Sequence, residues 1–302
     1  MAALVALVIA RSLNLDTVRA ASSVSGTRVR RPDERDRSIL ARWLAEGVYV
    51  HRHLDWRPPL DWLGHPFWWT LERDRQPLAV LACPDDPPEI AWLRLFAYRS
   101  PVSLSWAWQV LWEQARHALG EKKPMVGAIA IEYWLEPLLQ RARFEMRQRV
   151  VVLEWRAHAT FPSEGDLPVR AMRPEDLQAV AQIDWQAFAP PWHNSLESLR
   201  RALSQALFAT VLEIEGKILG YQITTGHPFG AHLARLAIHP QVQGNGWGRK
   251  LLQHLFALLA QRRIERLTVN TQHDNRVSLA LYRRLGFERT GEEFPVYIYD
   301  WR

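Results

Sequence analysis

The sequence of 302 residues predicts an α/β fold with a mixed sheet (α+β), present in two tandem copies. Three observations lead to this prediction. The chain contains a long internal repeat, strand and helix patterns alternate around one sheet in each copy, and 48% of the residues are hydrophobic, which is enough for two cores. Charged residues make up 23%, which is typical of a folded chain and not of a disordered one.

The repeat consists of four pairs of similar segments, each pair spaced by 141 to 143 residues. In chain order the pairs begin at Arg31 and Arg173, Pro77 and Ile218, Trp92 and Leu233, and Leu138 and Leu281. Each match alone is weak, but four in the same order indicate a duplicated domain. We therefore expect an N-terminal extension over 1–26, a first domain over 27–160 and a second domain over 167–302.

The second copy shows its first elements clearly. A strand over 167–172 precedes a helix over 174–188, and Pro174 lies in the first helical turn, where its missing N–H costs nothing. A second helix is expected to begin at Asn194, because Glu197 follows at the spacing of a capping box.

The remaining elements follow from their hydrophobic periods. A hairpin over 209–226 turns at Glu215–Lys217, and a helix over 248–263 carries one apolar stripe of five leucines. Those leucines are Leu251, Leu252, Leu255, Leu258 and Leu259. The other expected elements are strands at 233–240 and 266–272, a helix at 275–287 and a terminal strand at 295–301.

A glycine-rich stretch joins an apolar strand to this leucine-rich helix. Gly244, Gly246 and Gly248 allow positive φ and leave the backbone uncovered, so that successive N–H groups converge at a helix N-terminus. Arg249 and Lys250 add positive charge beside them. The spacing fits neither a P-loop nor a dinucleotide-binding loop. On its own, the stretch indicates either an anion-binding loop or an ordinary strand-to-helix turn.

Two motifs of the second copy resemble those of the GCN5-related N-acetyltransferases. Gln243–Gly248 is similar to their diphosphate loop Q/R-x-x-G-x-G/A, and Asn275–Phe287 is similar to their motif N-x-x-[AS]-x-x-x-Y-x-x-x-G-F. One helix and one strand separate the motifs, as in that family. The likeness covers 167–302, and within the family this copy resembles the ribosomal-protein alanine N-acetyltransferases.

The resemblance implies two tandem acyl-CoA N-acyltransferase folds, with a mixed sheet that splays apart between the strands expected at 233–240 and 266–272. Acetyl-CoA would be the cosubstrate, with its pantetheine arm on the open strand edge and its diphosphate on the loop amides. Tyr282 would protonate the leaving thiolate, although its helical pattern also fits a tyrosine whose ring lies in the core. No metal is expected. The cofactor-binding residues that the resemblance implies are Leu236, Ala237, Ile238, Gln243, Gly244, Asn245, Gly246, Trp247, Gly248, Arg249, Asn275 and Tyr282.

The general base stays open. In the alanine N-acetyltransferases a glutamate precedes the second motif, and Asn270 stands at the matching position, where it cannot act as a base. His232 is a catalytic candidate, because a two-residue strand period places it in phase with Leu236 and Ile238. The alternative for His232 is a solvated loop histidine. Weaker candidates are His227, Glu292 and Glu293.

The first copy lacks these motifs. It has no glycine between Ala97 and Leu119, and Leu139 stands where the second copy has Tyr282. We therefore expect a degenerate acetyltransferase fold without the diphosphate-binding loop. A chain of two copies, of which only the second is intact, is similar in layout to mycothiol synthase.

Charge and cysteine content limit the partners. The net charge of +6 is a mild basic bias that fits an anionic ligand, and without a long Lys/Arg block no nucleic-acid partner is expected. The apolar run Ala2–Ala10 is too short to span a bilayer and has no basic residues before it, so neither a membrane partner nor a signal peptide is expected. The single cysteine, Cys83, reads as a small buried hydrophobe, and it favours a cytoplasmic location.

These inferences predict an N-acetyltransferase. It would move an acetyl group from acetyl-CoA to a primary amine by direct attack in a ternary complex, and the amine would belong to a protein N-terminus or a small molecule. The alternative is a non-catalytic acyl-CoA-binding or scaffold protein, which the missing glutamate favours.

Overall fold

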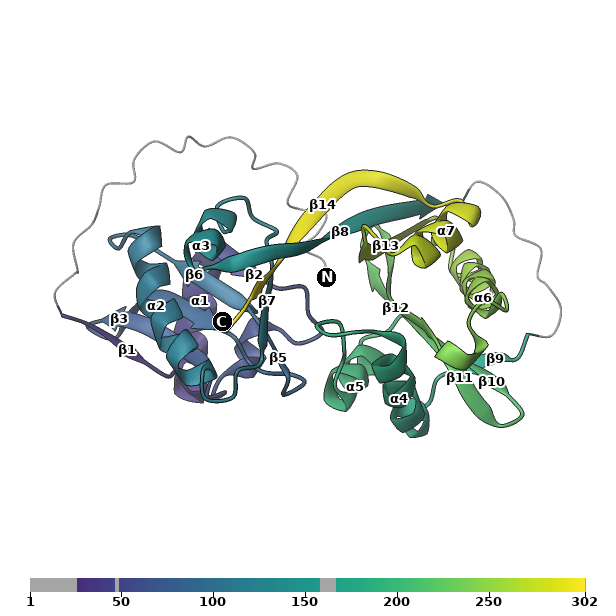
Figure 1. The fold of residues 1–302 in the computed structure, drawn as a ribbon, viewed down its shortest axis with the longest axis horizontal. Coiled ribbons are helices and arrows are strands. Elements are labelled where there is room, and N and C mark those ends of the chain that lie inside the picture. The colour runs from purple at the N-terminus through teal and green to yellow at the C-terminus, as the bar shows by residue number, and fades with distance from the viewer. Residues whose placement is uncertain (1–25, 47–48, 158–166, 302) are drawn as a thin grey trace. The chain divides into compact units, whose positions relative to one another are not determined.

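The computed structural model describes residues 26–46, 49–157 and 167–301. The predicted extension and its apolar run lie outside these residues, except for Gly26. Two compact units are present (Figure 1). The C-terminal unit contains 148–294, and the N-terminal unit contains the described residues up to Arg147 together with those from Pro295 onward. The predicted domains, 27–160 and 167–302, follow the two copies of the repeat and stay a prediction. The compact units have other limits, because each unit also contains a stretch of chain from the other copy.

The C-terminal unit is a mixed sheet with two helices on each face. Its strand order is β14-β8-β13-β12-β11-β10-β9, in which β12 and β13 run parallel. Its elements are β9 (Val169–Ala171), α4 (Leu177–Ala187), α5 (Leu196–Ser204), β10 (Phe208–Ile214), β11 (Lys217–His227), β12 (Gly230–Ile238), α6 (Trp247–Gln261), β13 (Arg266–Gln272) and α7 (Arg276–Arg284). It also contains most of β8 (Phe144–Arg156) and the first part of β14 (Glu288–Tyr299).

The helices of the C-terminal unit form where the apolar period predicts them. Four of the five stripe leucines of α6 are buried, and only Leu258 is half-buried. One prediction is wrong by one residue, because Ser195 and not Asn194 caps α5. The Ser195 hydroxyl accepts the Ser198 N–H at 3.0 Å, and the Asn194 backbone N–H donates instead to the buried carboxylate of Asp184.

The N-terminal unit contains a five-stranded sheet of order β1-β3-β4-β6-β2 and a second set of order β5-β7-β14. Its elements are β1 (Thr27–Arg30), α1 (Arg37–Glu46), β2 (Tyr49–Arg52), β3 (Trp68–Arg73), β4 (Gln76–Ala82), β5 (Ile90–Trp92), β6 (Leu95–Tyr98), α2 (Leu104–Leu119), β7 (Met125–Ile129) and α3 (Glu136–Arg141).

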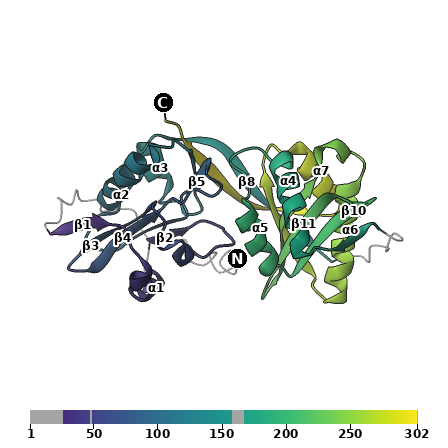
Figure 2. The same ribbon diagram turned by 90° about the horizontal axis from the view of Figure 1, so that it is seen from below.

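Helices α1 and α2 cover opposite faces of the five-stranded sheet (Figure 2). The alternation along β4 shows the same division, because Ala79 and Leu81 pack in the core that contains α2, whereas Val80 and Ala82 pack in the core that contains α1. Cys83 follows them and is fully buried, as predicted, and burial raises the pKa of its thiol.

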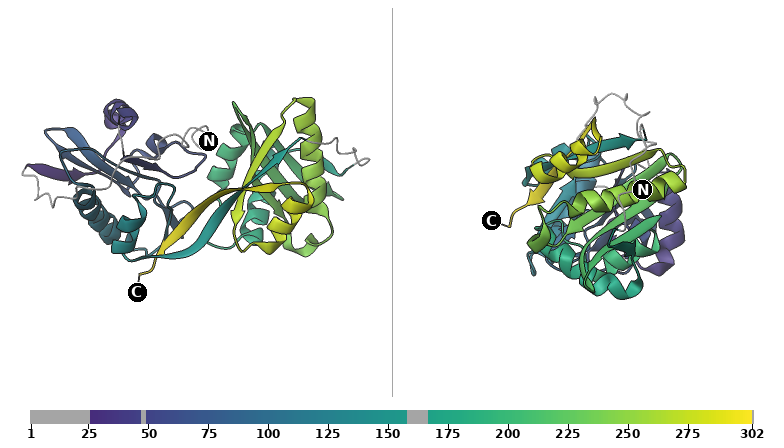
Figure 3. Two further views of the ribbon diagram at one scale, coloured as in Figure 1. Left: turned by 90° about the horizontal axis from the view of Figure 1, so that it is seen from above. Right: turned by 90° about the vertical axis from the view of Figure 1, so that its right-hand side faces the viewer.

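Two strands are exchanged between the copies of the repeat. In the C-terminal unit, Val150–Arg156 of β8 pairs with β13, although β8 belongs to the first copy. In the N-terminal unit, Val296–Tyr299 of β14 pairs with β7, although β14 belongs to the second copy. Figure 3 shows the two strands from another side, β8 in teal and β14 in yellow. Each unit therefore completes its sheet with chain from the other copy. Among the described helices, none is long and apolar enough to cross a membrane.

Candidate active site

The open edge of β12 is the first component of the candidate site. Parallel pairing with β13 joins only Ala231–Leu233 to Leu267–Val269, and β13 then continues along β8. On the other side, β12 stays paired with β11 as far as Ile238. The predicted splay is therefore confirmed. Beyond Leu233, the edge of β12 that faces away from β11 has no strand partner within the described chain.

A bulge changes the phase of β12. Thr224 pairs with Leu233 and Ile223 pairs with Arg235, so Ala234 is an extra residue. His232 therefore shares a face with Arg235 and not with Leu236. The prediction that His232 is in phase with Leu236 and Ile238 is wrong, because one inserted residue shifts every later side chain to the opposite face.

The glycine loop directly follows this edge. Gly244 and Gly246 have φ of 82° and 80°, as predicted, and Gly246 is the N-cap of α6 without any side-chain cap. A Cβ at either position would meet nothing within 4 Å. The first N–H groups of α6 have no intrahelical partner, so backbone donors are available at the positive end of the helix dipole.

The prediction of positive φ is wrong for Gly248, which has another reason for being glycine. Its φ is not positive, and an added Cβ would lie 3.3 Å from Leu281 Cδ2 of α7. The glycine therefore allows α6 and α7 to approach closely. Gln243 anchors the other end of the loop, since its Nε2 donates to the Ile238 carbonyl at 2.9 Å.

Asn275 and Tyr282, the two residues of the second motif with expected roles, lie at different places on α7. Asn275 is the N-cap of α7, where its Oδ1 accepts the Ser278 N–H at 3.1 Å and its Nδ2 donates to Gln272 Oε1 at 3.3 Å. Tyr282 lies about two turns further along α7. It is 5% exposed, and its ring lies 5.3 Å from that of Phe287. Burial raises the pKa of Tyr282, so its phenol stays protonated at neutral pH.

His232 is buried at the closed end of the splay. Its Nδ1 lies 2.8 Å from Thr268 Oγ1 on the neighbouring strand, and burial lowers the pKa of His232 to about 4. The imidazole is therefore neutral at pH 7. His232 is not the solvated loop histidine of the alternative interpretation.

Asn270 and the weaker base candidates occupy different surroundings. The side-chain Oδ1 of Asn270, on β13, is buried and accepts no hydrogen bond within the described residues. His227 is half-buried at the end of β11, and its Nδ1 accepts the Phe229 N–H at 3.1 Å. Glu292 and Glu293 are exposed on β14.

A buried ion pair that the sequence analysis missed joins the face of β12 to α4. Arg235 Nε donates to Asp184 Oδ2 at 2.7 Å, and its second terminal nitrogen donates to the Trp192 carbonyl at 2.6 Å. Tyr221 also donates to Asp184, at 2.5 Å, and the Arg235 guanidinium lies 3.4 Å from the Phe188 ring centroid. These contacts hold the loop after α4 against the sheet. No local pattern connects residues 51 positions apart.

The equivalent edge in the N-terminal unit is closed. There the sheet also splays, because β5 pairs with β7 whereas β6 pairs with β4, but β2 pairs with the free edge of β6 from Leu95 to Tyr98. Helix α2 begins at a Ser103 cap whose hydroxyl accepts the Trp106 N–H at 3.3 Å. The N-terminal unit therefore has neither the open edge nor the uncapped glycine loop.

Comparisons with known proteins agree with this geometry. The family model of the acetyltransferase (GNAT) family matches residues 177–287. The [ribosomal protein bS18]-alanine N-acetyltransferase of Escherichia coli K12 is 30% identical over 119 residues, which cover 39% of this chain and 79% of the relative.

Two solved structures are similar over nearly the whole chain. A GCN5-related N-acetyltransferase from Sphaerobacter thermophilus has a TM-score of 0.60 at 15% identity, covering 92% of this chain and 96% of the other. A tandem GNAT protein from the clavulanic acid biosynthesis pathway has a TM-score of 0.61 at 14% identity, covering 90% and 98%. At this identity the two structures show the shared fold, which confirms the predicted tandem architecture.

Proposed function

Because this chain belongs to the GNAT family and is an acyl-CoA-dependent N-acetyltransferase, we propose that its C-terminal unit transfers an acetyl group from acetyl-CoA to a primary amine. The observation that carries this proposal is the unpaired edge of β12, which leads directly into a loop with two left-handed glycines. The edge offers backbone groups to the amides of a pantetheine arm, and the loop offers N–H groups to a diphosphate. The residues present therefore fit acyl-CoA.

Each part of the C-terminal unit has a proposed role in a ternary complex. Acetyl-CoA supplies a thioester carbonyl that the free amine attacks directly. A backbone N–H of β12 near Leu236 would stabilise the developing oxyanion. Tyr282 would donate its phenolic proton to the departing sulfur, for which a protonated phenol is the required form.

The acceptor amine is proposed to bind along the face of β12 that carries Arg235 and His232. The Asp184–Arg235 pair would hold the loop after α4 in place beside this binding site. His232 stays our proposed base. Asn270 Oδ1 accepts no hydrogen bond from the residues that the structure describes, so it could accept one from an amine N–H. The relative that modifies an N-terminal alanine supports a peptide N-terminus as acceptor, and a small-molecule amine is the second candidate.

Calorimetric titration of the whole chain with acetyl-CoA is the first test. We expect one site per chain, because the edge of β6 in the N-terminal unit is occupied by β2. Two equivalent sites would contradict the assignment of the N-terminal unit as degenerate, and no binding would contradict the proposed donor.

Release of CoA in the presence of an amine panel tests the reaction. A thiol reagent can follow it with little background, because the only cysteine, Cys83, is fully buried. The panel should contain alanine-initiated peptides and small amines of equal charge. Binding without release for every amine would favour a non-catalytic acyl-CoA-binding protein.

A further inference from the structure

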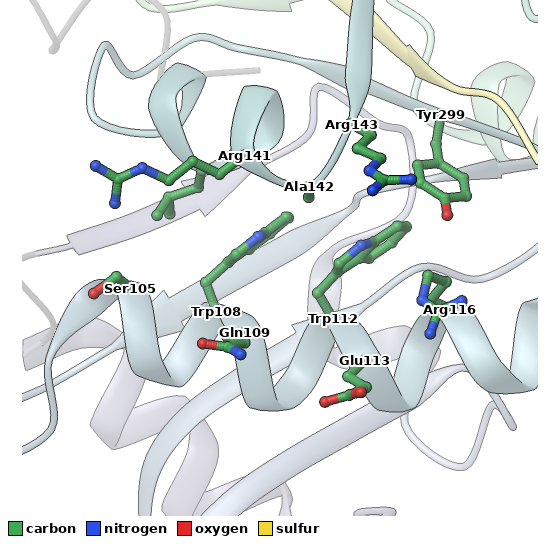
Figure 4. A pocket seen from close by; sticks show the side chains of 11 residues that line it. Ser105, Trp108, Gln109, Trp112, Glu113, Arg116, Arg141, Ala142, Arg143 and Tyr299 are labelled. Carbon is green, nitrogen blue, oxygen red and sulfur yellow. The ribbon is translucent and has the colours of Figure 1, made fainter. Parts of the chain in front are cut away.

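A groove in the N-terminal unit has no part in the proposed reaction (Figure 4). It has a volume of about 750 Å³ and follows the flank of α2 from Ser105 to Arg116, opposite the segment that joins α3 to β8. A groove of this size is in the range of small-molecule sites. It lies along the side of the helix and not at the closed cofactor edge of β6.

The rim of the groove carries unpaired positive charge. Arg116, Arg141 and Arg143 line it, all three are exposed, and none of them forms an ion pair with any described residue. Glu113 is the one acidic residue among the lining residues. Because guanidinium groups form strong bidentate hydrogen bonds with phosphates, three of them around one groove favour an anionic ligand.

Arg143 occupies a backbone conformation that favours glycine. Its φ is 65°, and its counterpart in the second copy is Gly286, with φ of 86°. A left-handed conformation costs a side-chain-bearing residue about 1 kcal/mol. Glycine would satisfy the fold at this position. Of the six described non-glycine residues with positive φ, Arg143 is the one that lines the groove.

The floor of the groove is aromatic. The indoles of Trp108 and Trp112 rise from α2 toward the segment that contains Ala142 and Arg143 (Figure 4). They are stacked 5.8 Å apart, with their planes 8° from parallel. The half-buried ring of Tyr299 meets Trp112 edge-on at 5.1 Å. Both tryptophans are almost completely buried, so this floor is rigid. The faces of both indoles pack against each other and against other core rings, so a planar ring that carries phosphate would contact only their edges and the half-buried ring of Tyr299.

We propose that the groove binds a small anion of the nucleotide class, with its phosphates on Arg116 and Arg143 and its ring against Tyr299 at the same end of the groove (Figure 4). This site is separate from the acyl-CoA site of the C-terminal unit, and the proposal does not depend on the reaction proposed above.

Calorimetric titration with ADP tests the proposal on the full chain carrying Gly244→Asp, a change that places a carboxylate in the glycine loop and so weakens anion binding there. We expect one ADP site per chain. Arg143→Gly should weaken ADP binding about tenfold or more, by loss of charge-assisted hydrogen bonds, while the protein unfolds at the same or a higher temperature. That combination distinguishes a binding residue from a structural one.

The control is Arg42→Ala, which removes an exposed arginine from α1 on the opposite face of the same sheet and should leave ADP binding unchanged. Adenosine and pyrophosphate should each bind more weakly than ADP. The proposal is overturned if the combined change Arg116→Ala, Arg141→Ala and Arg143→Gly leaves ADP binding intact, or if ADP does not bind. Equal affinity for pyrophosphate would overturn the role of the ring.

Discussion

Burial keeps two side chains of the C-terminal unit uncharged at neutral pH. It raises the pKa of the Tyr282 phenol and lowers that of the His232 imidazole to about 4. In both cases desolvation disfavours the charged form. The consequences differ, because Tyr282 stays a proton donor, whereas His232 is a weak base.

Tyr282→Phe tests the proton donor. Loss of general acid catalysis should lower kcat about 100-fold or more, with acetyl-CoA affinity nearly unchanged. Stability should also change little, because no hydrogen bond of the Tyr282 hydroxyl is found among the described residues and the ring remains in the core. Steady-state kinetics, calorimetry and thermal unfolding measure the three quantities. A kcat equal to that of the wild type would remove Tyr282 as the acid.

The buried His232 leads to a second prediction, which concerns how the stability of the protein depends on pH. Its pKa is about 4 when folded, against an ordinary value of 6.5, so the unfolded chain binds the proton more tightly. The stability that depends on a neutral His232 is therefore present above pH 6.5 and is lost as the pH falls toward 4. It amounts to about 3 kcal/mol.

His232→Asn removes this titration and can still bond to Thr268. Denaturant unfolding between pH 7 and pH 4 should therefore show a smaller loss of stability in the variant than in the wild type. Identical pH profiles would mean that His232 has the same pKa in the folded and the unfolded chain. The proposed role of His232 as the general base gives a separate prediction. His232→Ala should lower turnover more than it lowers acetyl-CoA affinity. An unchanged pH–rate profile in that variant would exclude His232 as the base.

At the scale of single elements, the glycine loop and the bulge of β12 show what a sequence can and cannot predict. Positive φ at Gly244 and Gly246 could be predicted, because glycine is the residue that adopts it without strain. The bulge at Ala234 could not, since an extra residue in a strand leaves the apolar pattern of "LARLAI" unchanged. For the same reason the face of His232 was predicted wrongly.

Gly244→Asp and Gly216→Asp form a matched pair that tests the loop. Both glycines have left-handed φ, at 82° and 74°, and neither would bring a Cβ within 4 Å of another atom, so the backbone cost should be the same. Only Gly244→Asp places a negative charge where the diphosphate is proposed to bind. We expect acetyl-CoA affinity to fall at least about tenfold in that variant alone. An equal effect of both changes would indicate a general loss of fold.

At the scale of the whole molecule, the repeat predicted two similar folds but not the exchange of strands between them. A strand segment has the same alternating pattern whichever neighbour it pairs with, so "PVYIYDW" could be predicted as a strand without its partner being known. In the structure, β7 and β8 are the neighbours of β14.

The exchange predicts which fragment of the chain folds. A fragment of 167–302 follows the repeat but lacks β8, whose Val151, Leu153 and Trp155 lie in the core of the C-terminal unit. Losing large core side chains costs about 2–5 kcal/mol each, which is comparable with the whole stability of a domain. A fragment of 148–294 retains them.

We therefore expect 148–294 to unfold cooperatively and to bind acetyl-CoA, and 167–302 to do neither. Circular dichroism during thermal unfolding and calorimetry compare the two fragments. A stable, binding-competent 167–302 would show that β8 is dispensable for the C-terminal unit.

The strand exchange also fixes an order in time when the protein is made. A ribosome releases the chain from its N-terminus, yet the N-terminal unit needs Val296–Tyr299 to cover β7, and Trp301 Nε1 to donate to the Pro124 carbonyl at 2.6 Å. The first unit to be synthesised is therefore the last to be completed. Its partial sheet must wait, with the edge of β7 uncovered, until Val296–Tyr299 has been synthesised.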